Sequence, residues 1–264
     1  MFGSLVDTSK TLAAAVDLLN SLDPLPDVVI ATGDLTDDGT KAQYEKLFEI
    51  LSPLKIPLLP LPGNHDENLE FRSSFPNLID ENMPLDHCSY VIENFPIRLI
   101  GLDTSLPGRH DALFGEAQEN WLAETLLAEP NKPTLLFTHF PPFITGINFM
   151  DLSGLKSADR LEKMIRSNPQ IKLVIAGHLH RSIQTNFGNT LVSVCPSTGN
   201  QLELTLNPKK GSAVDEPPGF QLHIWNEERF VTHTGIIWEG NSLDMSEYVS
   251  YVTEKTSKGE ALHK

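Results

Sequence analysis

The stretch IKLVIAGHLH (residues 171–180) joins an apolar run to two histidines that follow it directly. Residues 171–176 predict a buried strand, because a short apolar run bounded by glycine is typical of a strand covered on both faces. The end of this strand delivers His178 and His180, and alternate residues of an extended chain point to the same side. Such a pair is typical of a metal site, with an ordinary loop as the competing interpretation.

Three further apolar runs are each followed by a polar side chain that can bind a metal. These runs and side chains are 27–32 with Asp34, 57–61 with Asn64 and His65, and 134–137 with His139. Taken singly, each polar residue is explained as well by a turn or a helix cap. Because ligands bind beyond the carboxyl ends of strands in open α/β sheets, we expect these side chains to meet. Together they supply carboxylate, amide oxygen and imidazole, the ligands of divalent metals.

The roles of two of these residues follow from their chemistry. Asp34 is the only carboxylate of the set, so it is the residue placed to bridge two metal ions. Two ions about 3.5–4 Å apart clamp a phosphoryl group and generate hydroxide near neutral pH. His65 follows the candidate ligand Asn64 and is left to hydrogen-bond the phosphoryl oxygens or to protonate the leaving group.

The rest of the pattern alternates helices with strands and then continues with strands alone. Helices are predicted over 40–51, 115–128 and 157–167, and strands over 87–92, 97–103, 182–186, 190–194, 220–225 and 230–237. This order favours an α/β fold of mixed sheets in one domain, residues 1–240. The Pro- and Gly-rich residues 207–219 predict a surface loop. Residues 241–264 predict a polar tail, loosely ordered or forming a short helix.

Composition excludes several classes of function. A net charge of -15 without a basic stripe argues against a nucleic-acid polymer as partner. No apolar run reaches the ~20 residues that span a bilayer, and no secretory signal is visible, so a cytoplasmic protein without a membrane partner is expected. The cysteines, Cys88 and Cys195, are expected to be buried, reduced thiols. A small phosphodiester is the expected partner, and a homodimer is possible.

The polar blocks resemble the successive signature motifs of the calcineurin-like metallophosphoesterases. These blocks are Gly33-Asp34, Gly63-Asn64-His65-Asp66, His139 and Gly177-His178-Leu179-His180. The resemblance implies a four-layer α/β/β/α sandwich of mixed sheets with a centre of two divalent ions, iron, manganese or zinc. It implies that Asp34 bridges the ions, with Asn64, His139 and His178 on one ion and His180 on the other. It also implies that His65 is the catalytic residue and that Asp34, Asn64, His65 and His180 contact the substrate.

Other segments resemble one branch of this family, the bacterial class III 3',5'-cyclic-nucleotide phosphodiesterases. These segments are 1–8, 102–108, 118–122, 195–198 and 216–220. The related glycerophosphodiesterases share several of them. The resemblance therefore implies hydrolysis of 3',5'-cyclic AMP to AMP, with a glycerophosphodiesterase or a broad-specificity phosphodiesterase as the alternative.

One family motif, an Asp-x-His pair at the end of the first strand, has no counterpart near Met1. One ion would then keep four ligands, and the other only Asp34 and His180. Two explanations are open: a start of translation further upstream, or a shortened chain that acts as a mononuclear enzyme or a non-catalytic metal-binding scaffold. We favour the first, because the other chemical residues are retained. The missing strand would leave a neighbouring strand with unpaired backbone groups.

The remaining polar residues are predicted to lie outside the site. Asp37 and Asp38 predict a solvated turn. Surface or packing roles are expected for His87, His110, His223 and His233. Arg109 and Arg181 lie on segments that leave the site. Two roles are compatible with their positions: contact with the substrate, or a solvated place on the surface.

Overall fold

A six-stranded mixed sheet forms the centre of the computed structural model, which describes residues 6–79, 84, 87–238, 240 and 243–259. The four inner strands are parallel and the two edge strands are antiparallel to their neighbours. In sheet order the strands are β3 (Tyr90–Ile92), β4 (Arg98–Gly101), β6 (Thr134–Phe137), β8 (Ile171–Ala176), β10 (Thr190–Val194) and β9 (Ile183–Phe187).

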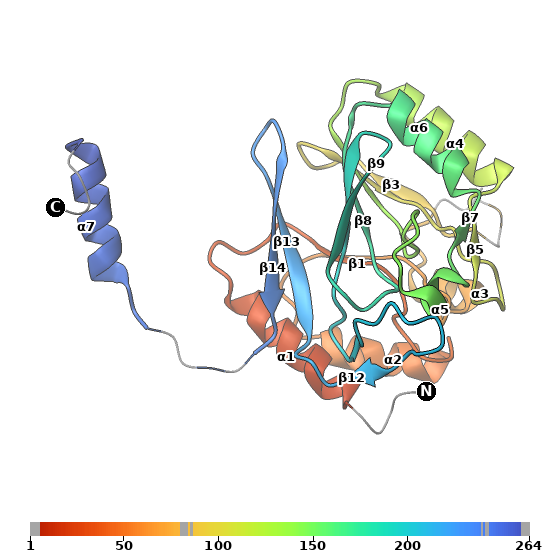
Figure 1. Cartoon of the computed structure of the whole chain (residues 1–264), viewed down its shortest axis with the longest axis horizontal. Helices are drawn as coiled ribbons and strands as arrows, with labels where there is room; N and C mark the ends of the chain where they lie inside the picture. The colour runs from red at the N-terminus through yellow and green to blue at the C-terminus, as the bar shows by residue number, and fades with distance from the viewer. Residues whose placement is uncertain (1–5, 80–83, 85–86, 239, 241–242, 260–264) are drawn as a thin grey trace.

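Shorter sheets complete the strand content of the described chain. A parallel pair, β1 (Val29–Ala31) with β2 (Leu58–Pro60), and a hairpin, β13 (Gly219–Trp225) with β14 (Phe230–Ile236), lie beside the large sheet (Figure 1). Two minor pairs are β11 (Gln201–Leu202) with β12 (Ala213–Val214), and β5 (Ala112–Leu113) with β7 (Leu155–Lys156).

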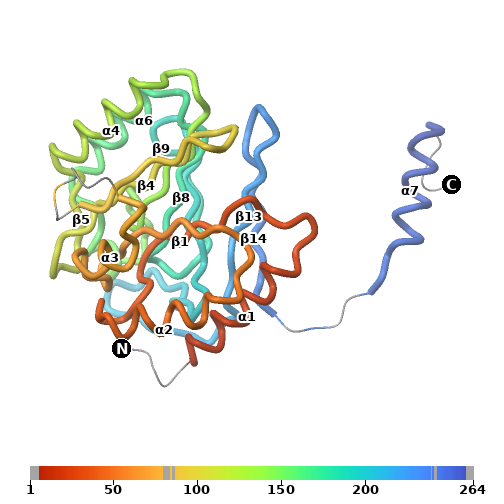
Figure 2. Tube along the Cα trace, turned by 180° about the vertical axis from the view of Figure 1, so that it is seen from behind, coloured from red at the N-terminus to blue at the C-terminus, as the bar shows by residue number. Residues whose placement is uncertain are grey.

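The helices lie on both sides of the sheets. One group is α4 (Glu116–Ala128) and α6 (Ala158–Ser167), and the other is α1 (Thr8–Ser21), α2 (Lys41–Leu51) and α3 (Asn68–Ser74). The two views in Figures 1 and 2 place these groups on opposite sides of the molecule. A single turn, α5, covers Asn148–Asp151, and the C-terminal helix α7 covers Ser246–Ser257.

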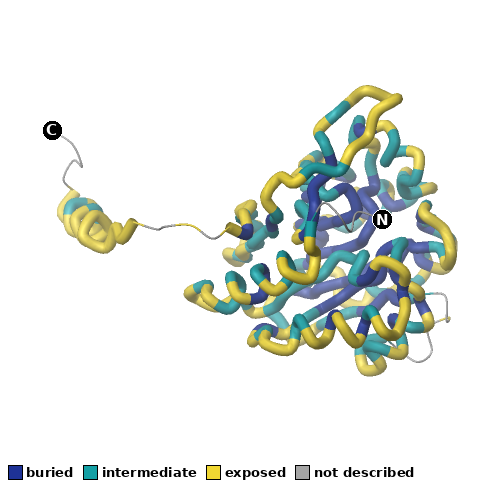
Figure 3. Tube along the Cα trace, turned by 90° about the horizontal axis from the view of Figure 1, so that it is seen from below, coloured by how far each residue is buried: buried dark blue, intermediate teal, exposed yellow. Residues whose placement is uncertain are grey.

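Alternation along the inner strands shows why the layers stack in this order. In β8, Val174 packs in one apolar cluster with Leu122 of α4 and Leu161 of α6. Its neighbour Leu173 faces the other way and packs with Leu59 of β2. Successive residues of a strand point to opposite faces, so the six-stranded sheet has helices on one face and the shorter sheets on the other. The result is the predicted α/β sandwich, with its buried residues at the centre of the body (Figure 3).

The predicted helices and strands are present, with two differences in detail. The helical spacing of 40–51 puts Phe48 on one apolar face with Tyr44 and Leu47, but Phe48 is 39% exposed and contacts Phe75 at a ring-centroid distance of 5.4 Å. The predicted loop at 207–219 contains the short strand β12 and the first residue of β13. Of the segment 1–8, residues 1–5 lie outside the described residues.

Among the described strands, β1 has one partner and one open edge. β1 pairs with β2 on one side, and no described strand pairs with its other edge. Its three residues are only half-buried, whereas every residue of β4 and β6 is buried. At the C-terminal end, α7 has no buried residue and stands apart from the body (Figure 1). Within the described ranges, no helix combines the length and apolar character that crossing a membrane requires.

Candidate metal centre

Four strand ends bring potential metal ligands to one place. Asp34 follows β1, Asn64 follows β2, His139 follows β6 and His178 follows β8. One potential ligand atom from each of Asp34, His139 and His178 lies within 4.8 Å of the others. Asn64 joins them, because its Oδ1 lies 3.2 Å from His139 Nε2. The two sheets therefore meet at these side chains.

Potential ligand atoms of three other side chains surround one ring nitrogen of His139. His139 Nδ1 lies 2.7 Å from the Thr32 carbonyl oxygen, which can only accept, so Nδ1 carries a proton and Nε2 is the nitrogen that faces the other candidate ligands. That Nε2 lies 3.3 Å from Asp34 Oδ2 and 3.2 Å from both Asn64 Oδ1 and His178 Nδ1. The buried His178 Nε2 has no hydrogen-bond partner. Asp34 Oδ2 and Asn64 Oδ1 both accept, so the position beside His139 Nε2 suits a positive charge, and carboxylate, amide oxygen and imidazole together fit a divalent metal there.

The pKa values show how strongly these groups interact. Burial alone would lower the pKa of His139, but the charge and hydrogen bond of Asp34 outweigh it and raise that pKa, so a bound divalent ion would take the place of the proton on Nε2. Burial alone would raise the pKa of Asp34, but the charge and hydrogen bond of His139 outweigh it and hold that pKa well below its usual range. Burial, with the charge of His139 next, lowers the pKa of His178 to about 3. Burial also lowers the pKa of His180. At neutral pH the site thus offers a charged carboxylate and neutral histidines at 178 and 180, the forms that bind metals.

The histidine pair at the end of β8 is not built as predicted. Residues 177–180 are not extended: His178 and His180 have φ angles of 68° and 49°, in the left-handed region that non-glycine residues rarely adopt. Asp34 shares this conformation, with a φ of 54°. Only His178 joins the compact group, while His180 Nδ1 donates to the Asn200 carbonyl oxygen at 3.0 Å. Strain of this kind gathers at functional sites, and here it turns the two rings to different partners.

Two glycines allow the site loops to approach one another. A Cβ atom on Gly63 would overlap the Asp34 side chain and backbone. A Cβ on Gly33 would lie 2.5 Å from His139 Nδ1, and the φ of Gly33 is 106°. Any larger residue at either position would displace a candidate ligand, which explains why glycine precedes both Asp34 and Asn64.

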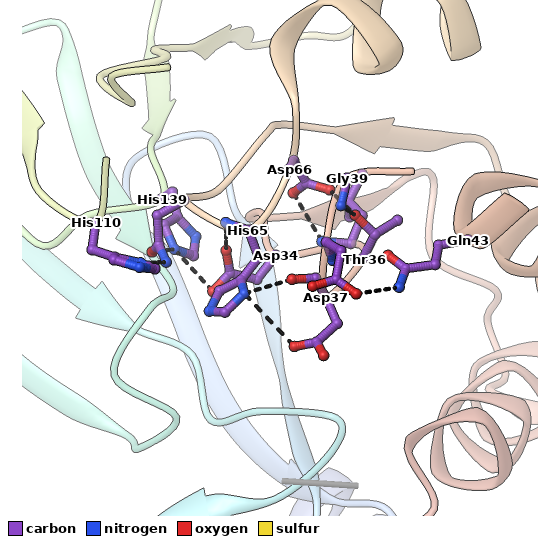
Figure 4. A network of polar contacts seen from close by, with 12 residues as sticks. Asp34, Thr36, Asp37, Gly39, Gln43, His65, Asp66, His110 and His139 are labelled. Carbon is purple, nitrogen blue, oxygen red and sulfur yellow. Dashed lines mark hydrogen bonds and ion pairs between the residues drawn. The ribbon is translucent and has the colours of Figure 1, made fainter. Parts of the chain in front are cut away.

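Asp66 joins the loops that contain Asp34 and Asn64 by hydrogen bonds to both of them. Its Oδ2 accepts the backbone N–H groups of Leu35 and Gly63, both at 2.9 Å. Its Oδ1 accepts the hydroxyls of Thr36 at 3.0 Å and Tyr44 at 2.8 Å. Part of this network is drawn in Figure 4. Sequence reasoning included Asp66 in a motif but missed this role, because no local pattern reveals partners about thirty residues away.

His65 is oriented by two contacts. Its backbone N–H donates to Asp34 Oδ1 at 3.0 Å, and its Nδ1 donates to the Asp37 carbonyl oxygen at 2.8 Å (Figure 4). Nε2 is therefore the nitrogen that remains for a substrate. Asp37 lies exposed in a bend, in agreement with the predicted solvated turn, and its backbone carbonyl also holds this ring.

His110, predicted to have a surface or packing role, is exposed but lies beside the site. Its Nδ1 is 3.4 Å from Asn64 Nδ2, and its ring centroid is 5.9 Å from that of His65. It belongs to the loop that leaves the carboxyl end of β4. The general position of ligand sites at strand ends would have indicated it, although its own residue pattern did not.

The two arginines for which the sequence left two roles form ion pairs within the protein. Arg109 forms a two-point ion pair with Asp111, at 2.6 and 2.8 Å. Arg181 donates to the Leu202 carbonyl oxygen and pairs with Glu216 at 3.0 Å.

Comparison with known proteins agrees with this geometry. Residues 7–182 match the family profile described as calcineurin-like phosphoesterase. The chain belongs to this family. A probable glycerophosphodiester phosphodiesterase from Arcobacter nitrofigilis is 39% identical to this phosphoesterase over 237 residues, which cover 88% of this chain and 86% of that protein. A 3',5'-cyclic-nucleotide phosphodiesterase from Nostoc is 30% identical, covering 82% of this chain and 79% of that protein.

A solved structure shows the same fold. A dimetal phosphatase from Danio rerio superposes with a TM-score of 0.68 at 16% identity, covering 88% of this chain and 87% of that one. The predicted family and its mixed α/β sandwich are therefore confirmed.

Proposed function

We propose that this phosphoesterase hydrolyses a small phosphodiester with the help of a divalent metal. Asp34, Asn64, His139 and His178 would hold the ion, and His180 would serve a second ion together with Asp34. The observation that carries the proposal is the ring of acceptors around His139 Nε2, at 3.2–3.3 Å. A divalent ion would bind these oxygen and nitrogen atoms together, in place of a proton on His139.

The roles of the protein groups follow from their contacts. A divalent ion bound there supplies Lewis acidity toward a phosphoryl oxygen and lowers the pKa of water. Asp34 orients His65 by accepting its backbone N–H, and the Asp37 carbonyl holds its ring. We infer that His65, once protonated at Nε2, donates to the leaving oxygen of the diester or to a phosphoryl oxygen.

For the substrate we propose 3',5'-cyclic AMP, hydrolysed to AMP. Support comes from the Nostoc relative, named a 3',5'-cyclic-nucleotide phosphodiesterase. A glycerophosphodiester is the second candidate, favoured by the name of the Arcobacter relative, which is 39% identical. Iron, manganese and zinc all suit a mixed set of carboxylate, amide and imidazole ligands.

A substrate screen tests the proposal. The full chain is loaded with manganese and offered 3',5'-cyclic AMP, glycerophosphoethanolamine and a phosphomonoester. The expected result is diester hydrolysis that stops on chelation and returns with manganese. Cleavage of the monoester alone would contradict the proposed reaction, and metal binding without any turnover would instead indicate a metal-binding scaffold. Preference for the glycerophosphodiester would replace the substrate and keep the chemistry.

A further inference from the structure

His110 borders both the candidate metal centre and an open cavity. The cavity has a volume of about 330 Å³, and its wall consists of Arg109, His110, Asp111, Leu152 and Ser153. On the other side, the His110 ring contacts the Asn64 side chain. A diester whose phosphoryl group sits at the centre would therefore have room for one of its alcohol arms on the His110 side.

The side-chain amide of Asn64 fixes the tautomer of His110. Asn64 Oδ1 faces His139 Nε2 at 3.2 Å, where an acceptor suits either a proton on that nitrogen or a bound ion, so Nδ2 is the atom that faces His110, at 3.4 Å. An amide nitrogen only donates, and His110 Nδ1 must therefore accept. The ring proton then belongs to Nε2. This assignment follows from the hydrogen-bond network, as ring protons in proteins are normally assigned.

His65 has the opposite arrangement. Because its Nδ1 donates to the Asp37 carbonyl, the neutral ring of His65 presents a lone pair at Nε2. The two rings lie 5.9 Å apart between centroids (Figure 4), so a substrate near one can reach the other. An anionic diester needs hydrogen-bond donors, and in the neutral form His110 has one to offer where His65 has none.

We propose that His110 binds the substrate, donating its Nε2–H to an oxygen of the diester. This inference rests on the proposed phosphodiesterase function and adds a second imidazole to it. The contact is present in the ground state and in the transition state, so its loss should raise KM more than it lowers kcat.

Three substitutions test the contact, with bis(p-nitrophenyl) phosphate as the probe and the manganese-loaded full chain as the enzyme. His110→Gln keeps both an acceptor for Asn64 and an N–H donor, whereas His110→Phe and His110→Ala keep neither. We expect kcat/KM to fall about 10- to 100-fold in His110→Phe and His110→Ala, and less than about threefold in His110→Gln. His233→Ala, which removes an exposed imidazole from β14, is the matched control and should leave kcat/KM unchanged.

Manganese titration of each variant distinguishes two roles of His110: contact with the substrate, and positioning of Asn64 as a metal ligand. The proposal requires a manganese Kd within about threefold of wild type in all His110 variants. A weakened Kd that accounts for the lost activity would overturn it, because His110 would then act only through Asn64. Equal kcat/KM in wild type and His110→Phe would overturn it as well. A wild-type chain that hydrolyses no diester would refute the proposed function instead, so the two failures are distinguishable.

Discussion

At the residue scale, the site separates metal binding from proton chemistry. The candidate ligands crowd around His139 Nε2, while His65 contacts this group only through its backbone N–H to Asp34. Its ring is held instead by the Asp37 carbonyl. Substituting the ring should therefore disturb the chemistry without disturbing the ion.

His65→Ala should lower turnover strongly and leave metal content nearly unchanged. If His65 supplies a proton, the loss in kcat should be ~10²–10⁴-fold for a substrate with a poor leaving group. A nitrophenolate leaving group needs no proton and should recover part of the loss. The measurement compares kcat for 3',5'-cyclic AMP and bis(p-nitrophenyl) phosphate in wild type and variant. Equal losses on both substrates would assign His65 to phosphate orientation rather than to acid catalysis.

The sequence allowed most of the site residues to be predicted, for a simple reason. Carboxylate, amide and imidazole side chains each followed an apolar run, and strand ends converge in α/β sheets. The Asp37 carbonyl and His110 could not be found in this way. One acts through its backbone, which has no residue signature, and the other lies in a loop whose path depends on the whole fold.

At the element scale, the network of Asp66 joins the loops after β1 and β2. Four donors end on this one buried carboxylate, from Leu35, Thr36, Tyr44 and Gly63. Asp66→Ala would leave all four without their partner, and each buried unsatisfied group costs about 1–3 kcal/mol. We expect the free energy of unfolding, measured by urea titration, to fall by about 3 kcal/mol or more.

Asp66→Asn is the matched control for this prediction. Its amide oxygen can still accept the two backbone N–H groups, and its amide nitrogen can donate to the two hydroxyl oxygens. The free energy of unfolding should therefore fall by less than about half as much in Asp66→Asn as in Asp66→Ala. Equal destabilisation by both substitutions would show that the charge of Asp66, rather than its accepting geometry, stabilises the loops.

The hairpin β13–β14 should give a measurable pH dependence through His223. Burial lowers the pKa of His223 to about 4, and its ring contacts Thr232 Oγ1 at 2.8 Å. In the unfolded chain the pKa is about 6.5, so between these values the unfolded state binds the additional proton. This contribution to stability is complete above about pH 6.5 and is lost as the pH falls toward about 4.

Comparison with His223→Gln isolates this effect from the titration of other groups. Urea midpoints measured at several pH values between 4 and 7.5 should fall less steeply in the variant than in wild type. Parallel curves would mean that His223 has the same pKa in both states and is not buried in solution.

The elements themselves were predictable where one period dominated the sequence. In the large sheet, β6 and β8 were predicted from apolar runs, and α2, α4 and α6 were predicted from helical spacing. The geometry of the His178 and His180 pair was not predictable, because it depends on a left-handed turn rather than on the extended chain assumed for the motif. The minor strands have two residues each, too few for any period to show.

At the scale of the whole molecule, the phosphoesterase body and the C-terminal segment are predicted to be independent. No residue of α7 is buried, and Figure 3 shows this helix as mostly exposed. Deleting residues 241–264 should therefore change the free energy of unfolding by less than about 0.5 kcal/mol and leave turnover intact. Urea titration and the diester assay measure both. A clear loss of stability would show that α7 packs on the body.

The central claim is that divalent metal held by side chains from the two sheets, with Asn64 as one ligand, is required for the phosphodiesterase chemistry. Asn64 tests it most directly, because it is a neutral ligand candidate from β2 that faces His139 from the other sheet. Its removal leaves the charge of the site unchanged. Asn131→Ala, in an exposed turn, is the matched control.

The measurement is a calorimetric titration of manganese into wild type, Asn64→Ala and Asn131→Ala, with diester turnover recorded on the same samples. The account predicts at least a tenfold weaker Kd and a matching loss of turnover in Asn64→Ala, with the control unchanged and the melting temperatures of the metal-free proteins equal. Unchanged manganese binding and turnover in Asn64→Ala, or diester hydrolysis by wild type that survives complete removal of metal, would contradict it.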